Sequence, residues 1–147
     1  MIIRIMRHGD APLIDGERQL SENGKKEVRA MAKWLAGQSE PDIVLVSPIL
    51  RAQQTAQQLE PFLTHHYRRA DEELLKPEAD AQIATAYFEA LSANNLLLIS
   101  HMPLVVNLLE AWLPGQGRYF PTATIAELEI KGSEAKLKQF ISPDDLT

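Results

Sequence analysis

The sequence predicts an α/β protein with three layers, in which helices cover both faces of a mostly parallel sheet with one antiparallel edge strand. Three short apolar runs of strand length alternate with segments whose apolar residues recur at helical spacing. Residues 123–130 and 135–141, joined by Gly132-Ser133, predict a terminal β-hairpin at the antiparallel edge. The length of 147 residues suits one domain spanning residues 1–147.

The first strand and the first helix are predicted before residue 38. Residues 2–6 are too few and too β-branched for a helix, so they predict a buried strand. A polar loop follows as far as Leu20. Apolar residues then recur at helical spacing and predict a helix. Ser21 is its predicted N-cap, and Gly37 is its predicted C-terminal cap.

The second strand leads directly into a second helix. Residues 43–46 are all apolar and predict a buried strand. Ser47 is the predicted N-cap and Pro48 the first helical residue, since proline already has the helical φ angle there. The helix is expected to run to about Leu59, before Pro61 ends it.

The second half of the chain repeats this alternation. Residues 65–68 suggest a short strand, and Asp80 is the predicted N-cap of a third helix. Residues 96–99 form the third clearly buried strand of the prediction. Pro103 opens a last helix that continues to about Trp112.

Composition and charge narrow the class of partner. Apolar residues make up 45% of the chain and charged residues 24%, as in ordinary globular proteins. The net charge of −5 disfavours nucleic acid and anionic membrane surfaces as partners. No apolar stretch is long enough to span a membrane. The absence of cysteine excludes disulfides and thiolate metal sites, and we expect a cytoplasmic protein.

Each of the three apolar runs ends on an arginine or a histidine. Arg7-His8 follows the first run, Arg51 lies just beyond the second, and His101 follows the third. Ligands of open α/β sheets bind outside the carboxyl ends of the strands. Because the chain is acidic overall, cations gathered at this edge predict a pocket for a small anion, such as a phosphate.

Phosphoryl transfer needs the residue types that these positions supply. Two arginines can hold the charged oxygens, because the planar guanidinium binds bidentately. Neutral imidazole is a competent nucleophile when its other ring nitrogen donates to a carbonyl, and Gly9 permits a tight turn that brings one close. A second histidine, kept protonated beside the phosphate, would stabilise developing charge.

These motifs resemble those of the histidine phosphatase superfamily, the phosphoglycerate mutase-like group. The resemblance rests on Arg7-His8-Gly9, on Ser47-Pro48-x-x-Arg51-Ala52-x-x-Thr55 and on Ser100-His101, in the order of the family. Length and local sequence are most similar to the small bacterial phosphohistidine phosphatases. The resemblance implies a phosphoglycerate mutase-like fold, His8 as the phosphorylated nucleophile, and Arg7, Arg51 and His101 as phosphoryl ligands. It also implies no metal and no cofactor.

Arg18 is a further candidate for contact with the substrate, since the family often presents a basic residue from this loop. The resemblance further implies a phosphohistidine-bearing protein partner, such as a phosphorelay domain or a phosphotransfer protein.

The sequence departs from the family at the general acid. Many members place a glutamate where this chain has Pro77, and the acid phosphatase branch places an aspartate where it has Met102. Alkoxide leaving groups need a proton, whereas imidazole leaves a phosphoramidate more easily. The departure therefore favours phosphohistidine, although Glu73, Glu78 or Asp10 could supply the acid.

Three alternatives stay open at this point. The chain could hydrolyse small phosphate esters through one of those acids, or it could be a weakly catalytic module that binds phosphohistidine. A metal-dependent phosphoesterase is the least favoured, because no spacing of His, Asp and Glu resembles a ligand set.

Overall fold

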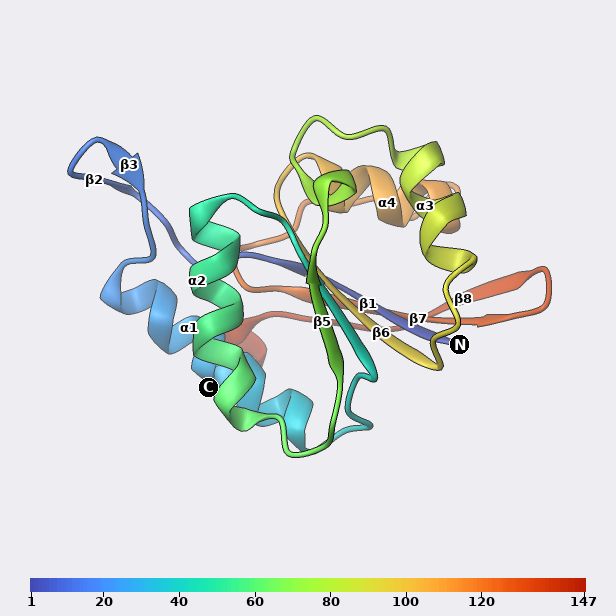
Figure 1. Ribbon diagram of the computed structural model, residues 1–147, viewed down its shortest axis with the longest axis horizontal. Coiled ribbons are helices and arrows are strands. Elements are labelled where there is room, and N and C mark those ends of the chain that lie inside the picture. The colour runs from blue at the N-terminus through green and yellow to red at the C-terminus, as the bar shows by residue number, and fades with distance from the viewer.

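The computed structural model describes residues 1–147 and contains a central six-stranded sheet with a small separate hairpin (Figure 1). The sheet has the order β5-β4-β6-β1-β7-β8. The strands are β1 (Ile2–Arg7), β2 (Leu13–Ile14), β3 (Glu17–Arg18), β4 (Ile43–Val46), β5 (Arg68–Asp71), β6 (Asn95–Ser100), β7 (Ile125–Lys131) and β8 (Glu134–Ile141).

Four neighbouring strands of the sheet are parallel, and the hairpin β7–β8 completes it. β1 pairs in parallel with β6, β6 with β4, and β4 with β5. β7 runs antiparallel to β1, and β8 runs antiparallel to β7 at the edge. The predicted α/β class, with a mostly parallel sheet and an antiparallel edge hairpin, is confirmed.

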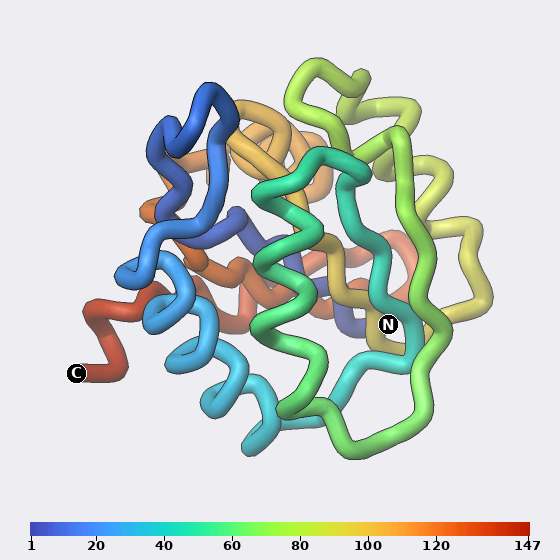
Figure 2. Tube along the Cα trace, turned by 60° about the vertical axis from the view of Figure 1, so that its left-hand side comes forward, coloured from blue at the N-terminus to red at the C-terminus, as the bar shows by residue number.

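Helices cover both faces of the sheet (Figure 1). They are α1 (Glu22–Ala36), α2 (Leu50–Leu59), α3 (Ala81–Glu89) and α4 (Leu104–Trp112). α1 and α2 pack together on one face, and α3 and α4 pack together on the other. Figure 2 shows α1 and α2 side by side, with the C-terminal turn next to α1.

The apolar strands divide their side chains between these two layers. In β6, Leu96 and Leu98 belong to the core under α3 and α4, whereas Leu97 and Ile99 belong to the core under α1 and α2. All four are fully buried. Successive side chains of a strand point to opposite faces, so a strand covered on both sides is apolar throughout.

Arg4 is the one charged residue of the predicted first strand, and it is 1% exposed. Its Nε donates to Glu127 Oε1 at 2.7 Å, and its Nη1 donates to the Ser39 carbonyl at 2.6 Å and to Asn95 Oδ1 at 3.1 Å. A buried charge is tolerated only when it is paired and hydrogen-bonded in this way. These contacts tie β7 and the loop before β4 to the middle of β1.

The structure corrects the predicted start of the second helix. α2 begins at Leu50, with Ile49 in the N-cap position, so Ser47 and Pro48 precede the helix. The Ser47 hydroxyl accepts from the Ile49 N–H at 3.3 Å instead of capping the first helical turn.

Two smaller differences concern loops. The short strand predicted over 65–68 lies at Arg68–Asp71, where it pairs with β4. The loop between β1 and α1 contains the hairpin β2–β3, which the sequence did not reveal. Figure 1 shows this hairpin projecting from the sheet edge where β1 ends.

The loop after β1 packs directly against the first turns of α1, with a glycine on each side. A Cβ on Gly9 would lie 2.8 Å from both the Gly24 carbonyl oxygen and Val28 Cγ2, and a Cβ on Gly24 would overlap the Asp10 carbonyl oxygen. Real Cβ atoms essentially never approach other atoms so closely. Neither glycine has a positive φ, so close approach is what requires them here.

We expect Gly24→Ala to lower the free energy of unfolding by about 1–3 kcal/mol, because the added methyl group must displace the loop. Helix propensity alone predicts the opposite sign, a gain of about 1 kcal/mol. Gly37→Ala is the matched control, since its Cβ would meet nothing closer than 3.5 Å. Urea denaturation measures both, and a Gly24→Ala variant as stable as the wild type would contradict the packing argument.

Candidate active site

The carboxyl ends of β1, β4 and β6 meet at one edge of the sheet and bring the predicted site residues together. Arg7 at the end of β1 is in register with Ser100 at the end of β6, and Val46 of β4 is in register with Ile99. His8 and His101 directly follow β1 and β6. The His8 and His101 ring centroids are 5.3 Å apart and edge-on.

The backbone of His8 is held from two sides. Its N–H donates to the Ser100 carbonyl at 3.1 Å, and its carbonyl accepts from the Ala123 N–H at 2.9 Å. The residue is 1% exposed. These bonds fix the backbone of His8 between β6 and the loop that precedes β7.

The ring of His8 has a defined tautomer. Nδ1 lies 2.7 Å from the Gly9 carbonyl oxygen, which can only accept, so Nδ1 carries the proton. Nε2 accepts from Arg51 Nε at 3.3 Å and is therefore the unprotonated nitrogen. Gly9 supplies this carbonyl as predicted, although its close packing on α1, and not an unusual turn, explains the glycine.

The pKa of His8 is lowered to about 4. Burial is the largest cause, since it disfavours the charged imidazolium, and the Arg51, Arg7 and Arg18 charges act in the same direction. The hydrogen bond to Gly9 opposes them. His8 is consequently neutral over the physiological pH range, with the Nε2 lone pair directed at Arg51.

Arg7 reaches the same pocket from the end of β1. Its Nη1 donates to the Phe120 carbonyl at 2.8 Å and to the Tyr119 hydroxyl at 3.1 Å. Its Nε is buried and has no partner within the protein. Buried N–H groups without a partner are rare, and they favour an anion as the missing acceptor.

Arg51 and Thr55 lie one turn apart on α2. The Thr55 hydroxyl donates to the Arg51 carbonyl at 2.8 Å and accepts from the Gly9 N–H at 3.1 Å. Burial and the charges of Arg18 and Arg7 lower the pKa of Arg51, which shows that the three cations share one region. The pocket therefore concentrates positive charge in an acidic protein.

His101 is fully buried, and its Nε2 lies 2.7 Å from the Ser47 hydroxyl. Its Nδ1 is buried without a partner. Burial, His8 and the nearby arginines lower the pKa of His101 to about 3. His101 is therefore neutral in the free protein, because the apolar surroundings and the nearby cations disfavour a further positive charge. The expectation of a protonated second histidine concerns the phosphate-bound state and stays a prediction.

Arg18 lies on β3 and is exposed, with its Nε donating to the Ala11 carbonyl at 2.9 Å. Its charge lowers the pKa values of His8, Arg51 and His101. The hairpin β2–β3 thus carries a basic side chain whose charge reaches the pocket from outside it.

The three acids proposed from the sequence are engaged or exposed. Asp10 Oδ2 accepts from the Ser21 hydroxyl at 2.7 Å, next to the start of α1. Glu73 pairs with Lys76 at 2.8 Å, and its side chain is 74% exposed. Glu78 is exposed. None of them hydrogen-bonds to His8, His101 or the arginines.

Sequence reasoning missed the residues that support the site. The sequence predicts Ser47 as a helix cap, but Ser47 contacts His101. The motif that contains Thr55 predicts no role for it, yet Thr55 bonds the Arg51 carbonyl. Glu27 on α1 accepts from the Asp10 N–H and from the Thr122 hydroxyl, both at 2.9 Å. The place of Thr55 in the motif Ser47-Pro48-x-x-Arg51-Ala52-x-x-Thr55 is the sequence signal that could have indicated a role for it.

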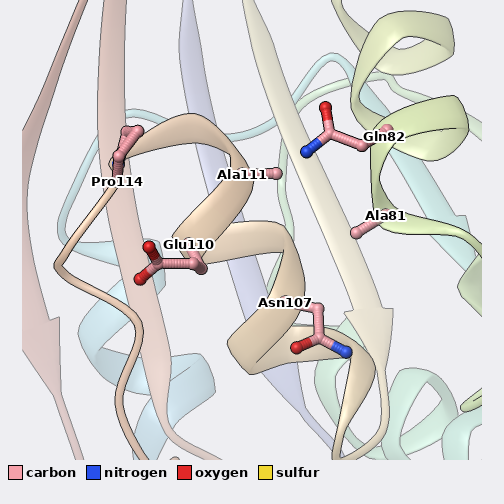
Figure 3. Close-up of a pocket in the computed structure, with 6 residues that line it drawn as sticks. All are labelled: Ala81, Gln82, Asn107, Glu110, Ala111 and Pro114. Carbon is pink, nitrogen blue, oxygen red and sulfur yellow. The ribbon is translucent and has the colours of Figure 1, made fainter.

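The largest hollow of the surface lies elsewhere, between α3 and α4, with a volume of about 410 Å³ (Figure 3). The residues that line it include none of the site residues above. The carboxylate of Glu110 in this hollow accepts from the Gly115 and Gly117 N–H groups.

Nowhere do three His, Asp or Glu side chains converge as a metal-ligand set. No helix has the length and apolarity needed to cross a membrane.

Comparison with known proteins gives a consistent result. A model of the histidine phosphatase superfamily (branch 1) matches residues 3–74. Phosphohistidine phosphatase SixA of Escherichia coli (strain K12) is 40% identical over 141 residues, which cover 90% of this chain and 88% of the relative. A SixA homolog of Haemophilus influenzae is 31% identical over 154 residues, covering 93% of each chain.

Among solved structures, the protein histidine phosphatase SixA complexed with tungstate superimposes with a TM-score of 0.92. It is 36% identical, and the match covers 100% of both chains.

We expect the His8 ring to titrate near pH 4, because its pKa is lowered from 6.5 to about 4. The unfolded chain then binds a proton at higher pH than the folded chain does, so stability falls as the pH drops from 6.5 towards 4. Imidazole NMR titration measures the midpoint, and His8→Asn identifies the resonance by its loss. A midpoint near 6.5 would contradict the proposed desolvation.

Proposed function

The chain belongs to the histidine phosphatase superfamily, and we propose that it is a phosphohistidine phosphatase in which His8 accepts the phosphoryl group. One observation carries the assignment of His8. Its proton is held at Nδ1 by the Gly9 carbonyl, and its Nε2 faces a pocket that contains two arginines and two unpartnered buried N–H or ring-nitrogen positions. The family and the identity to SixA support the substrate class.

Binding of the phosphoryl group uses the unpartnered groups. Arg7 Nε donates to one phosphoryl oxygen, and Arg51 exchanges its hydrogen bond with His8 Nε2 for one with another oxygen. A bound dianion raises the pKa of His101, so that its Nδ1 acquires a proton and donates to a third oxygen. The charge on His101 then appears only in the complex.

The first chemical step transfers the phosphoryl group between two imidazoles. The lone pair of His8 Nε2 attacks phosphorus in line, and the P–N bond to the substrate histidine breaks. The bonding electron pair stays on the substrate ring, which leaves as neutral imidazole when its distal nitrogen carries a proton. Arg7, Arg51 and His101 stabilise the charge on the equatorial oxygens.

The second step restores the enzyme. A water oxygen attacks phosphorus of phospho-His8, the P–Nε2 bond breaks, and the water proton passes to the phosphate product. The Gly9 carbonyl keeps Nδ1 protonated throughout, so His8 returns to the tautomer in which it began.

An imidazole leaving group suits a site that has no general acid beside His8 and His101. Met102 follows His101, and Pro77 occupies the predicted acid position, so neither supplies a proton. Glu73, Glu78 and Asp10 have no hydrogen bond to the site. An imidazole leaving group does not require such an acid, whereas an alkoxide does.

The phosphohistidine is carried by another protein in our proposal, such as a phosphorelay domain or a phosphotransfer protein, and the reaction takes place in the cytoplasm. The exposed Arg18 at the edge of the pocket contacts this partner or its phosphate. The acidic net charge of −5 makes nucleic acid an unfavourable partner.

We expect His8→Ala to lower kcat on a phosphohistidine protein by at least about a thousandfold, the scale for loss of a nucleophile. Rapid quenching of the wild type should trap an acid-labile, base-stable phosphate that His8→Ala lacks. His66→Ala, at an exposed histidine, is the control and should keep full activity. Full turnover by His8→Ala would overturn the nucleophile, and loss of wild-type activity with EDTA would overturn a metal-independent mechanism.

A comparison of leaving groups tests the substrate class. We expect kcat/KM on a phosphohistidine peptide to exceed that on an alkyl phosphate by at least about a hundredfold, because general acid catalysis is worth that much and is lacking here. Comparable rates on alkyl phosphates, with a bell-shaped pH profile, would show an acid at work. Glu73→Gln, Glu78→Gln and Asp10→Asn would then identify it.

A further inference from the structure

Tyr119 is an exposed aromatic residue in contact with the candidate phosphoryl site. Its side chain belongs to the loop between α4 and β7 and is 65% exposed. The hydroxyl accepts from Arg7 Nη1 at 3.1 Å, and the ring centroid lies 5.6 Å from Arg7 Cζ. Core packing does not explain a side chain in this position.

The backbone on the C-terminal side of Tyr119 is firmly fixed. Phe120 is fully buried, and its ring meets Phe140 edge-on with centroids 5.0 Å apart. Three residues later, the Ala123 N–H donates to the His8 carbonyl. Tyr119 therefore projects from a backbone that is tied to the same strand end as the nucleophile.

The two acceptors on Arg7 leave one side of its guanidinium free. Nη1 carries two protons, and the Phe120 carbonyl and the Tyr119 hydroxyl accept from it. Nε is buried without a partner, and no protein group accepts from it. Nε and Nη2 together form the fork that binds two oxygens of one phosphoryl group.

We propose that Tyr119 is a positioning residue, which holds Nη1 of Arg7 so that the Nε edge of the guanidinium faces the phosphoryl group. The proposal rests on the proposed function only for the identity of the bound group. With the Tyr119 hydroxyl removed, Phe120 alone holds Nη1, and the guanidinium can rotate away from the bidentate arrangement. Loss of the hydroxyl therefore weakens binding of the phosphoryl group equally in the ground state and in the transition state.

The test compares Tyr119→Phe, which keeps the ring, with the wild type. We expect the Kd for inorganic phosphate, measured by calorimetry, to rise about three- to tenfold, the effect of one net hydrogen bond. KM on a phosphohistidine peptide should rise by a similar factor at nearly unchanged kcat, as for lost uniform binding. Tm without phosphate should stay within about 1 °C of the wild type, since an exposed hydroxyl contributes little to stability.

Tyr87→Phe is the matched control, because Tyr87 is also exposed but lies on α3 with no contact to the arginines. It should leave the phosphate Kd and the kinetic constants unchanged. Tyr119→Ala should raise the phosphate Kd at least as much as Tyr119→Phe does.

An unchanged phosphate Kd in Tyr119→Phe would overturn the proposal. A lower Kd would overturn it too, because it would mean that the Tyr119 hydroxyl competes with phosphate for Arg7. A higher Kd with a clearly lower Tm would also overturn it, since the loop would act through general stability. The phosphate Kd is measured without any phosphohistidine substrate. The proposed role of Tyr119 can therefore be refuted while phosphohistidine hydrolysis is confirmed, and the role can be confirmed while that activity is absent.

Discussion

The contact between the loop after β1 and the first turns of α1 is the constraint on which the site depends. Gly9 and Gly24 face each other with no room for a side chain on either, so the loop lies on the helix backbone. Only this approach lets Glu27 of α1 accept from the Asp10 N–H, and Thr55 of α2 accept from the Gly9 N–H. The Gly9 carbonyl is thereby held within hydrogen-bond distance of His8 Nδ1. The tautomer of His8, the proposed nucleophile, thus depends on the close packing of Gly9 and Gly24.

Residues at the strand ends connect the two helical layers. α1 and α2 cover one face of the sheet, while His101 precedes α4 on the other face. Ser47, at the end of β4, contacts His101 across the strand ends. Both faces therefore contribute to a pocket that no single layer could form. Burial and the charges of three nearby arginines keep the two imidazoles neutral, and the same arginines favour an anionic ligand.

The candidate site residues could be predicted from the sequence, because Arg7, His8 and His101 directly follow apolar runs and Arg51 lies in the first turn of the helix after the second run. Arg7, His8, Arg51 and His101 need only the rule that parallel strands end at one edge. Their local state was harder to predict. The pKa of His101 depends on how many cations approach it and on how little water does, and neither follows from residue types. The roles of Ser47 and Tyr119 likewise arise from segments that are distant in the chain.

The position of β1 in the sheet has a consequence for how the protein is made. β1 lies between β6 and β7, so Ile2 pairs with Asn95 and Met6 with Ile125. The strand that leads into His8 is synthesised long before either neighbour, and pairing of such distant segments is slow because a long loop must close. On the ribosome, β1 therefore waits as an unpaired apolar segment until β6 and then β7 emerge. A fragment that ends before Ala123 cannot hold the backbone of His8 from both sides, so the pocket needs nearly the whole chain to be complete.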